Sequence, residues 1–71
     1  MNTVDARGLS CPEPVLRTRN ALESLPAGEA LEVLVETVTS RENVRRMAES
    51  KGYRVQVVET QDGFRLSIAR P

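Results

Sequence analysis

The sequence has no histidine and no tryptophan, a single cysteine, and only two aromatic residues, Tyr53 and Phe64. One cysteine forms no disulfide within the chain, and without histidine the usual ligand set of a zinc site is missing. Serine–histidine and cysteine–histidine catalytic pairs are excluded for the same reason. The scarcity of aromatic rings argues against a platform on which nucleic-acid bases stack. Any chemistry must therefore use one thiol, carboxylates, hydroxyls, arginines and backbone amides, and we expect no cofactor and no metal.

An excess of charge of either sign is also missing, because ten Lys and Arg residues balance ten Asp and Glu residues. Proteins that bind the phosphate backbone of nucleic acids or an anionic membrane surface generally carry a basic excess, so we expect no direct binding of nucleic acid and no binding to a membrane surface. The longest unbroken apolar run, Val33–Val35, is far shorter than the ~20 residues that span a bilayer or the ~7–15 apolar residues of a signal peptide. We therefore expect a cytoplasmic protein with one domain over residues 1–71.

What the chain does have is a hydrophobic pattern that switches between periods of two and 3.6 residues from end to end. These periods are typical of strands and helices, respectively. The resulting order is strand–helix–strand–helix–strand–strand. Crossover helices favour parallel pairing among the first three strands, and the last strand must run antiparallel to the third. The predicted strands span residues 3–6, 31–36, 53–58 and 64–69, and the predicted helices span residues 12–25 and 40–51.

Each predicted strand has an apolar face and a more polar one, so helices are not expected to cover both sides of the sheet. We predict an α+β fold: a two-layer α/β sandwich of order βαβαββ, in which a four-stranded mixed sheet carries both helices on one face. The first helix should bury a stripe made by Val15, Thr18, Leu22 and Leu25. The helix-free face of the sheet should expose Glu32, Glu36, Arg54, Gln56 and Arg65.

Three local signals predict where elements start and turn. Thr39–Glu42 matches a capping box, in which a threonine and a glutamate bind each other's unpaired amides. Gly52 is expected to end the second helix in a left-handed conformation. Asp62–Gly63 is typical of a two-residue type I′ hairpin, which would pair Val57 with Ile68.

Cys11 stands where the first helix is predicted to begin, as its N-cap, with Pro12 and Pro14 at the first and third helical positions. The unpaired N–H groups of a helix start act as about half a positive charge, and such a place lowers the pKa of a cysteine thiol. Arg7, across a flexible glycine, would add positive charge. Free cysteines are also often small buried hydrophobic residues, and this alternative interpretation stays open, although the paired prolines favour a reactive thiol.

Leu16 is predicted to lie beside Pro12 on the first helix, away from the centre of the apolar stripe. Two interpretations of Leu16 remain open. It forms part of an apolar rim on which partner proteins dock, or it folds back beneath the edge of the sheet.

The segment Asp5–Val15, DARGLSCPEPV, resembles the opening signature of the TusA/SirA/YedF-like sulfur-carrier family. That signature is an Asp, a Gly three residues on, and then Cys-Pro-x-Pro. The later runs Asn43–Ala48 and Gly52–Val55 resemble the YedF-like branch, so the resemblance extends over nearly the whole chain. One departure is Glu36–Thr37, where many relatives have Asp followed by a small polar residue.

The resemblance implies a βαβαββ two-layer fold and a sulfurtransferase-type carrier that accepts sulfane sulfur on Cys11 as a persulfide. The sulfur would pass to an acceptor protein in a relay for tRNA thiolation, sulfur metabolism or selenium metabolism. The implied partners are that acceptor and a sulfur donor, a cysteine desulfurase or a rhodanese. A thiolate that attacks a persulfide needs no general base, which fits the absence of histidine. The motif positions implied to support the thiol are Asp5, Gly8, Pro12, Glu13 and Pro14.

Two alternatives to the carrier stay open. One is a non-catalytic interaction or regulatory module with the same fold. The other is a thiol redox sensor in which Cys11 forms mixed disulfides, although the chain has no resolving cysteine.

Overall fold

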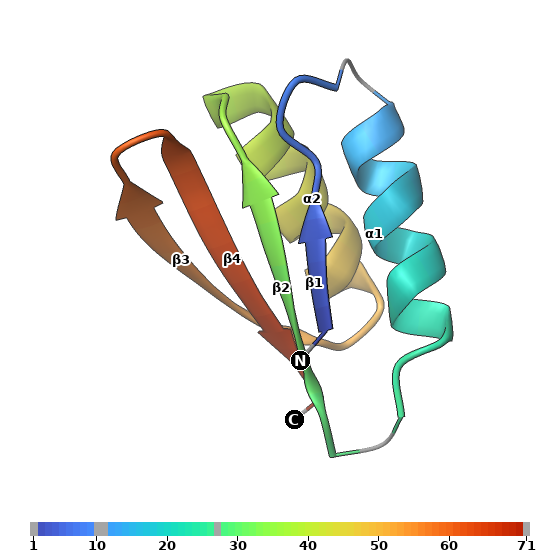
Figure 1. The fold of residues 1–71 in the computed structure, drawn as a ribbon. Coiled ribbons are helices and arrows are strands. Elements are labelled where there is room, and N and C mark those ends of the chain that lie inside the picture. Colours follow the sequence, from blue (N-terminus) through green and yellow to red (C-terminus); the bar gives the residue numbers. More distant parts are fainter. Residues whose placement is uncertain (1, 10–11, 27, 71) are drawn as a thin grey trace.

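The computed structural model describes residues 2–9, 12–26 and 28–70. Both helices lie on one face of the sheet, and the other face carries no helix (Figure 1). The predicted two-layer sandwich of order βαβαββ is therefore confirmed. Along these ranges the elements are β1 (Asn2–Asp5), α1 (Glu13–Glu23), β2 (Ala30–Val35), α2 (Val38–Ser50), β3 (Arg54–Thr60) and β4 (Gly63–Ala69).

The strands are arranged side by side in the order β1-β2-β4-β3. β1 and β2 are parallel, and β4 runs antiparallel to both of its neighbours. The expected parallel pairing therefore holds for β1 and β2 but not for β3, because β4 lies between β2 and β3. The inward residues of β4, Leu66 and Ile68, are completely buried, whereas Val57 on β3 is 38% exposed. The more apolar strand thus occupies the centre of the sheet and the less apolar one its edge.

The β3–β4 hairpin differs from the predicted one by two residues in register. Its loop consists of Gln61 and Asp62, and Val57 pairs with Leu66. No described residue other than glycine has a positive φ, so the loop is not a type I′ turn, which requires a positive φ at both of its residues. A shift of two residues leaves every side chain on its predicted face.

Gly63 is needed at the start of β4 because the backbone of β2 passes very close to it. A Cβ at Gly63 would lie 2.2 Å from the Val35 carbonyl oxygen and 2.6 Å from the Glu36 Cα. The φ of Gly63 is also +150°, in the region that favours glycine. A tertiary contact, and not the turn, therefore requires this glycine.

The core lies between the sheet and the two helices. The predicted stripe of α1 is confirmed, since Thr18, Leu22 and Leu25 are buried and Val15 is half-buried. The hydroxyl of Thr18 donates to the Pro14 carbonyl oxygen at 2.8 Å, so this buried polar group is paired. The buried apolar residues are Ala6, Leu22, Leu25, Leu31, Val33, Val35, Val44, Ala48, Leu66 and Ile68.

The second helix starts earlier than predicted. Its N-cap is Thr37, whose Oγ1 accepts a hydrogen bond from the Ser40 amide at 3.1 Å. The predicted capping box, which begins at Thr39, is therefore wrong. Glu42 instead binds Arg45 at 2.6 Å, in an ion pair on the helix surface.

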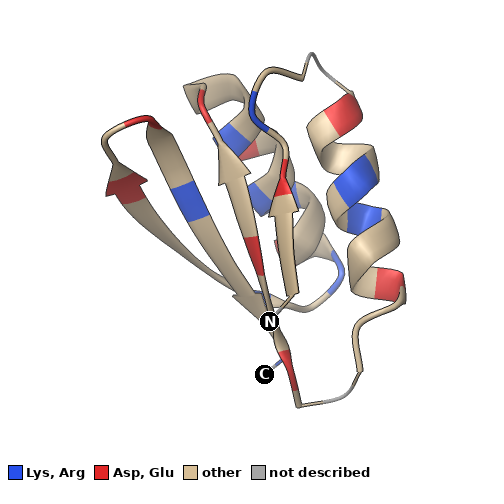
Figure 2. Ribbon diagram, viewed as in Figure 1, with Lys and Arg blue, Asp and Glu red and all other residues tan. Residues whose placement is uncertain are grey.

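The helix-free face of the sheet is exposed, as predicted, apart from Glu32, which is half-buried. Glu32 lies 3.7 Å from Arg65, so the two strands β2 and β4 share an ion pair on this face. Acidic and basic residues are both spread over the strands and α1 (Figure 2). Within the described residues, neither helix has the length and apolar character that crossing a membrane requires.

Candidate functional site at the β1–α1 loop

The predicted site lies in the loop that joins β1 to α1, at the end of the sheet where β1 and β2 finish (Figure 1). Cys11, the predicted sulfur-bearing residue, lies outside the described residues. The structure describes the residues on both sides of it, which form three separate supports of the loop. These are the start of α1, an ion pair that follows β1, and a hydrogen bond to the end of β2.

The first support is the start of α1. Pro12 is the N-cap, with φ −99° and ψ 15°, and Pro14 is in the first turn. The amide of Leu16 donates to the Pro12 carbonyl oxygen at 3.1 Å, the first hydrogen bond of the helix. The helix thus begins at Glu13, one residue later than predicted, and Cys11 precedes the N-cap in the sequence instead of being the N-cap. The two prolines have no N–H, and the other amides of this turn before Leu16 have no acceptor within the helix, so its positive end faces the loop.

Pro14 anchors this turn in the core. Its side chain is among the completely buried ones, and its carbonyl oxygen accepts the hydroxyl of Thr18. Pro12 and Glu13 are exposed on the outside of the turn, where Glu13 lies 3.6 Å from Arg17. The two prolines therefore differ in role, with one in the core and the other at the surface.

The second support is a pair formed by Asp5 and Arg7. Arg7 donates from Nε to Asp5 Oδ1 at 2.9 Å and from Nη2 to Oδ2 at 3.0 Å, and its backbone amide donates to Oδ1 at 3.2 Å. Hydrogen bonds from the Arg7 side chain, and then from its backbone amide, lower the pKa of Asp5 from 3.8 to about 2. The same pair raises the pKa of Arg7. A second carboxylate, that of Asp62, also lies near Arg7, with its Oδ2 at 3.8 Å from Nη1. Acidic groups therefore surround the guanidinium that was expected to assist the thiol.

The third support links the loop to β2. The amide of Gly8 donates to Glu36 Oε1 at 2.5 Å, and Gly8 has a φ of +78°. Sequence reasoning placed Glu36 only on the helix-free face and did not predict this contact. The contact could have been expected from the predicted parallel pairing of these strands. Because β1 and β2 are parallel neighbours, their carboxyl ends both lie beside the loop. Figure 2 shows the basic segment of the loop between the acidic ends of these strands.

The apolar part of the site is formed by Pro12 and Leu16. Pro12 is exposed, and Leu16 is 36% exposed. An exposure of this size favours the apolar rim over a side chain tucked beneath the sheet edge. Within the described ranges, no three side chains of the metal-binding types gather closely enough to hold a metal ion.

The crystal structure of the SirA-like protein from Desulfitobacterium hafniense matches with a TM-score of 0.86 and 39% identity, over 100% of both chains. The chain therefore has the SirA-like fold. The family model "Sulfurtransferase TusA" matches residues 2–70, and the chain belongs to this family.

Two curated relatives are similar over most of their lengths. "Putative sulfur carrier protein MJ0990" of Methanocaldococcus jannaschii is 44% identical over 71 residues, which cover 99% of this chain and 95% of the relative. "Sulfur carrier protein TusA" of Pseudomonas syringae pv. syringae is 30% identical over 60 residues, which cover 84% of this chain and 71% of the relative.

Proposed function

We propose that this protein is a sulfur carrier in which Cys11 accepts sulfane sulfur as a persulfide and passes it to an acceptor protein. The observation that carries the proposal is the position of Cys11, the single cysteine, directly before the Pro12 N-cap of α1. Membership of the TusA family over residues 2–70 supports the same function.

The proposed transfer is a thiol exchange. The Cys11 thiolate attacks the outer sulfur of a persulfide on the donor protein, the sulfur–sulfur bond of the donor breaks, and the donor cysteine leaves as a thiolate. Cys11 then carries the extra sulfur with its proton. In the second step a thiolate of the acceptor attacks that outer sulfur and releases Cys11 as a thiolate. No oxidant, reductant or general base is consumed on the carrier.

The described neighbours of Cys11 support this chemistry in two ways. The N-terminal end of α1 stabilises negative charge, which the Cys11 thiolate carries before the first step and again when it leaves in the second step. The Asp5–Arg7 pair and the Gly8–Glu36 hydrogen bond hold the preceding part of the loop against the ends of β1 and β2. Because Arg7 is already bound to Asp5, we assign it mainly to the shape of the loop.

The proposed partners are a sulfur donor, a cysteine desulfurase or a rhodanese, and a sulfur-accepting protein. Both must bring a cysteine to the same place. The exposed side chains of Pro12 and Leu16 offer an apolar contact beside it.

Intact-mass measurement tests the proposal. After incubation with a cysteine desulfurase and cysteine, or with a rhodanese and thiosulfate, the protein should gain the mass of one sulfur atom, and a thiol reductant should remove it. Cys11→Ser should keep the circular dichroism spectrum of the folded protein and gain no sulfur. The absence of reducible sulfur with both donors would contradict the carrier function and favour the interaction module. Glutathione adducts formed in preference to sulfane sulfur would instead indicate a redox sensor.

A further inference from the structure

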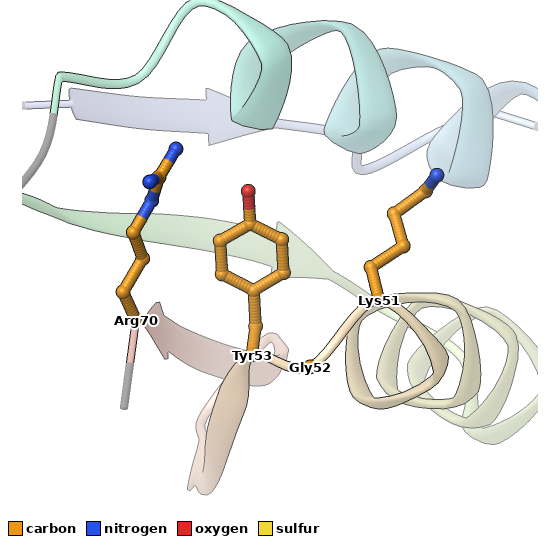
Figure 3. A pocket seen from close by; sticks show the side chains of 4 residues that line it. All are labelled: Lys51, Gly52, Tyr53 and Arg70. Atoms are coloured by element: carbon orange, nitrogen blue, oxygen red, sulfur yellow. The ribbon is translucent and has the colours of Figure 1, made fainter.

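A hollow lies at the end of the molecule opposite the β1–α1 loop, where α2 leads into β3. Its volume is about 370 Å³, and it is lined by Lys51, Gly52, Tyr53 and Arg70. Figure 3 shows that the side chains of Lys51, Tyr53 and Arg70 extend in the same direction and stand in a row, with Tyr53 between the two cations.

The turn after α2 directs two of these side chains into the hollow. Gly52 has a φ of +89° and ends the helix as the sequence predicted. Its amide donates to the Glu49 carbonyl oxygen at 3.0 Å, and the amides of Lys51 and Tyr53 both donate to the Ala48 carbonyl oxygen at 3.1 Å. These bonds fix the turn. The side chains of Lys51 and Tyr53 then lie on either side of Gly52 and both extend towards the hollow (Figure 3).

Arg70 completes the hollow from the end of β4. The antiparallel register pairs Arg54 with Ala69, so its continuation places Arg70 opposite Tyr53. The Arg70 Cζ lies 6.0 Å from the centre of the Tyr53 ring. The guanidinium and the phenol therefore line the same space from neighbouring strands.

The two cations of the hollow are not paired within the described residues. All ion pairs found among these residues involve other arginines, and none includes Lys51 or Arg70. Capping of α2 does not require the ammonium of Lys51, because backbone amides already bind the carbonyl oxygens of Ala48 and Glu49. In a chain with no net charge, this hollow is lined by a hydroxyl and by two cations that have no carboxylate partner among the described residues, so hydrogen-bond donors are concentrated there.

We propose that this hollow binds a phosphate-type oxyanion, either free or as the terminal group of a small molecule. The guanidinium of Arg70 offers paired donors to two oxygens, and the ammonium of Lys51 acts as a point charge. The Tyr53 hydroxyl supplies a neutral donor. This function is separate from the sulfur chemistry at the other end of the molecule.

The protein contains its own reporter for this test, because Tyr53 is the single tyrosine and there is no tryptophan. Inorganic phosphate, added at constant ionic strength, should change the Tyr53 fluorescence and the amide NMR shifts of residues 51–53 with saturation. Lys51→Gln and Arg70→Gln should each weaken binding about tenfold, as expected for loss of one charge-assisted contact. The matched control is Arg46→Gln, which removes an exposed charge from the same helix and should leave the affinity unchanged.

Comparison of ligands separates the two sources of the oxyanion. Tighter binding of adenosine monophosphate than of inorganic phosphate, with no binding of adenosine, would indicate a phosphate ester, and equal binding would indicate the free ion. A response that does not saturate, or that sodium chloride reproduces, would overturn the proposal. Equal weakening by Arg46→Gln would also overturn it. Sulfur loading of Cys11 is measured separately, so failure of either proposal leaves the other intact.

Discussion

Asp5 and Arg7 show how single residues hold the candidate site. Three hydrogen bonds from Arg7 converge on the Asp5 carboxylate, two from the guanidinium and one from the backbone. The pair thus fixes the side chain and the backbone at the start of the loop. Glu36 has a similar effect from the neighbouring strand, because its carboxylate binds the amide of Gly8. Both carboxylates thus accept hydrogen bonds from backbone amides of the loop and hold its backbone in place.

The Asp5–Arg7 pair predicts a specific pH dependence of stability. The pKa of Asp5 in the folded protein is about 2, below the ordinary 3.8, so its contribution is complete above pH ~4 and is lost as the pH falls towards 2. Asp5→Asn lacks this contribution. The difference in free energy of unfolding between wild type and Asp5→Asn, measured with urea, should therefore be constant from pH 6 to ~4 and should shrink towards pH 2.

Glu23→Gln is the matched control for this experiment, because Glu23 is an exposed carboxylate on α1. It has no ion pair within the described residues. Its difference from wild type should stay small at every pH. A wild type minus Asp5→Asn difference that does not change between pH 4 and 2 would show that Arg7 does not lower the pKa of Asp5.

At the scale of elements, the start of α1 is held by Pro14, which is buried in the core. Pro14→Ala should lower the free energy of unfolding by about 1–2 kcal/mol, because it frees the unfolded chain and removes buried apolar surface. A looser first turn should also slow the alkylation of Cys11 by iodoacetamide. Pro12→Ala, at an exposed position, should have the smaller effect on stability. If the rate and pH midpoint of alkylation are the same in Pro14→Ala as in wild type, the turn does not tune the thiol.

The junction between β2 and β4 predicts a strong effect at Gly63. In Gly63→Ala the new Cβ would meet the Val35 carbonyl oxygen at 2.2 Å, and the strands would have to separate. We expect a loss of more than about 3 kcal/mol, or no folded protein. Gly28→Ala is the control, because Gly28 also has a positive φ, +87°, but no atom within 4 Å of the added Cβ. It should cost about 1 kcal/mol in thermal or urea unfolding. Equal losses in the two variants would mean that the close approach of the strands has no energetic weight.

For the whole molecule, the strand order predicts where the structure is most resistant to opening. β2 and β4 are the inner strands of the sheet, and their inward residues Val33, Val35, Leu66 and Ile68 are completely buried. Amide hydrogen exchange should therefore be slowest in β2 and β4 and faster in the edge strands β1 and β3. Amides of β3 as slow as those of β4 would contradict this strand order or indicate that a second chain covers the β3 edge.

Local patterns in the sequence determined much of this fold. Alternating apolar residues defined the strands, and the stripe of Thr18, Leu22 and Leu25 defined the buried side of α1. Strands with one polar face required both helices to lie on the other face, and Gly52 marked the end of α2. The sequence by itself also pointed to the single cysteine and its flanking prolines as the site. These features depend on residues near one another in the chain, so their physical causes are visible there.

Only the tertiary structure decided features that depend on distant residues. β4 lies between β2 and β3, an order that no single segment reveals. The hairpin turns at Gln61–Asp62, and Gly63 after it passes close to the backbone of β2, a contact between segments distant in the sequence. Glu36 supports the loop because β1 and β2 end side by side. Lys51 and Arg70 are far apart in the sequence, and the β3–β4 pairing brings them to one hollow.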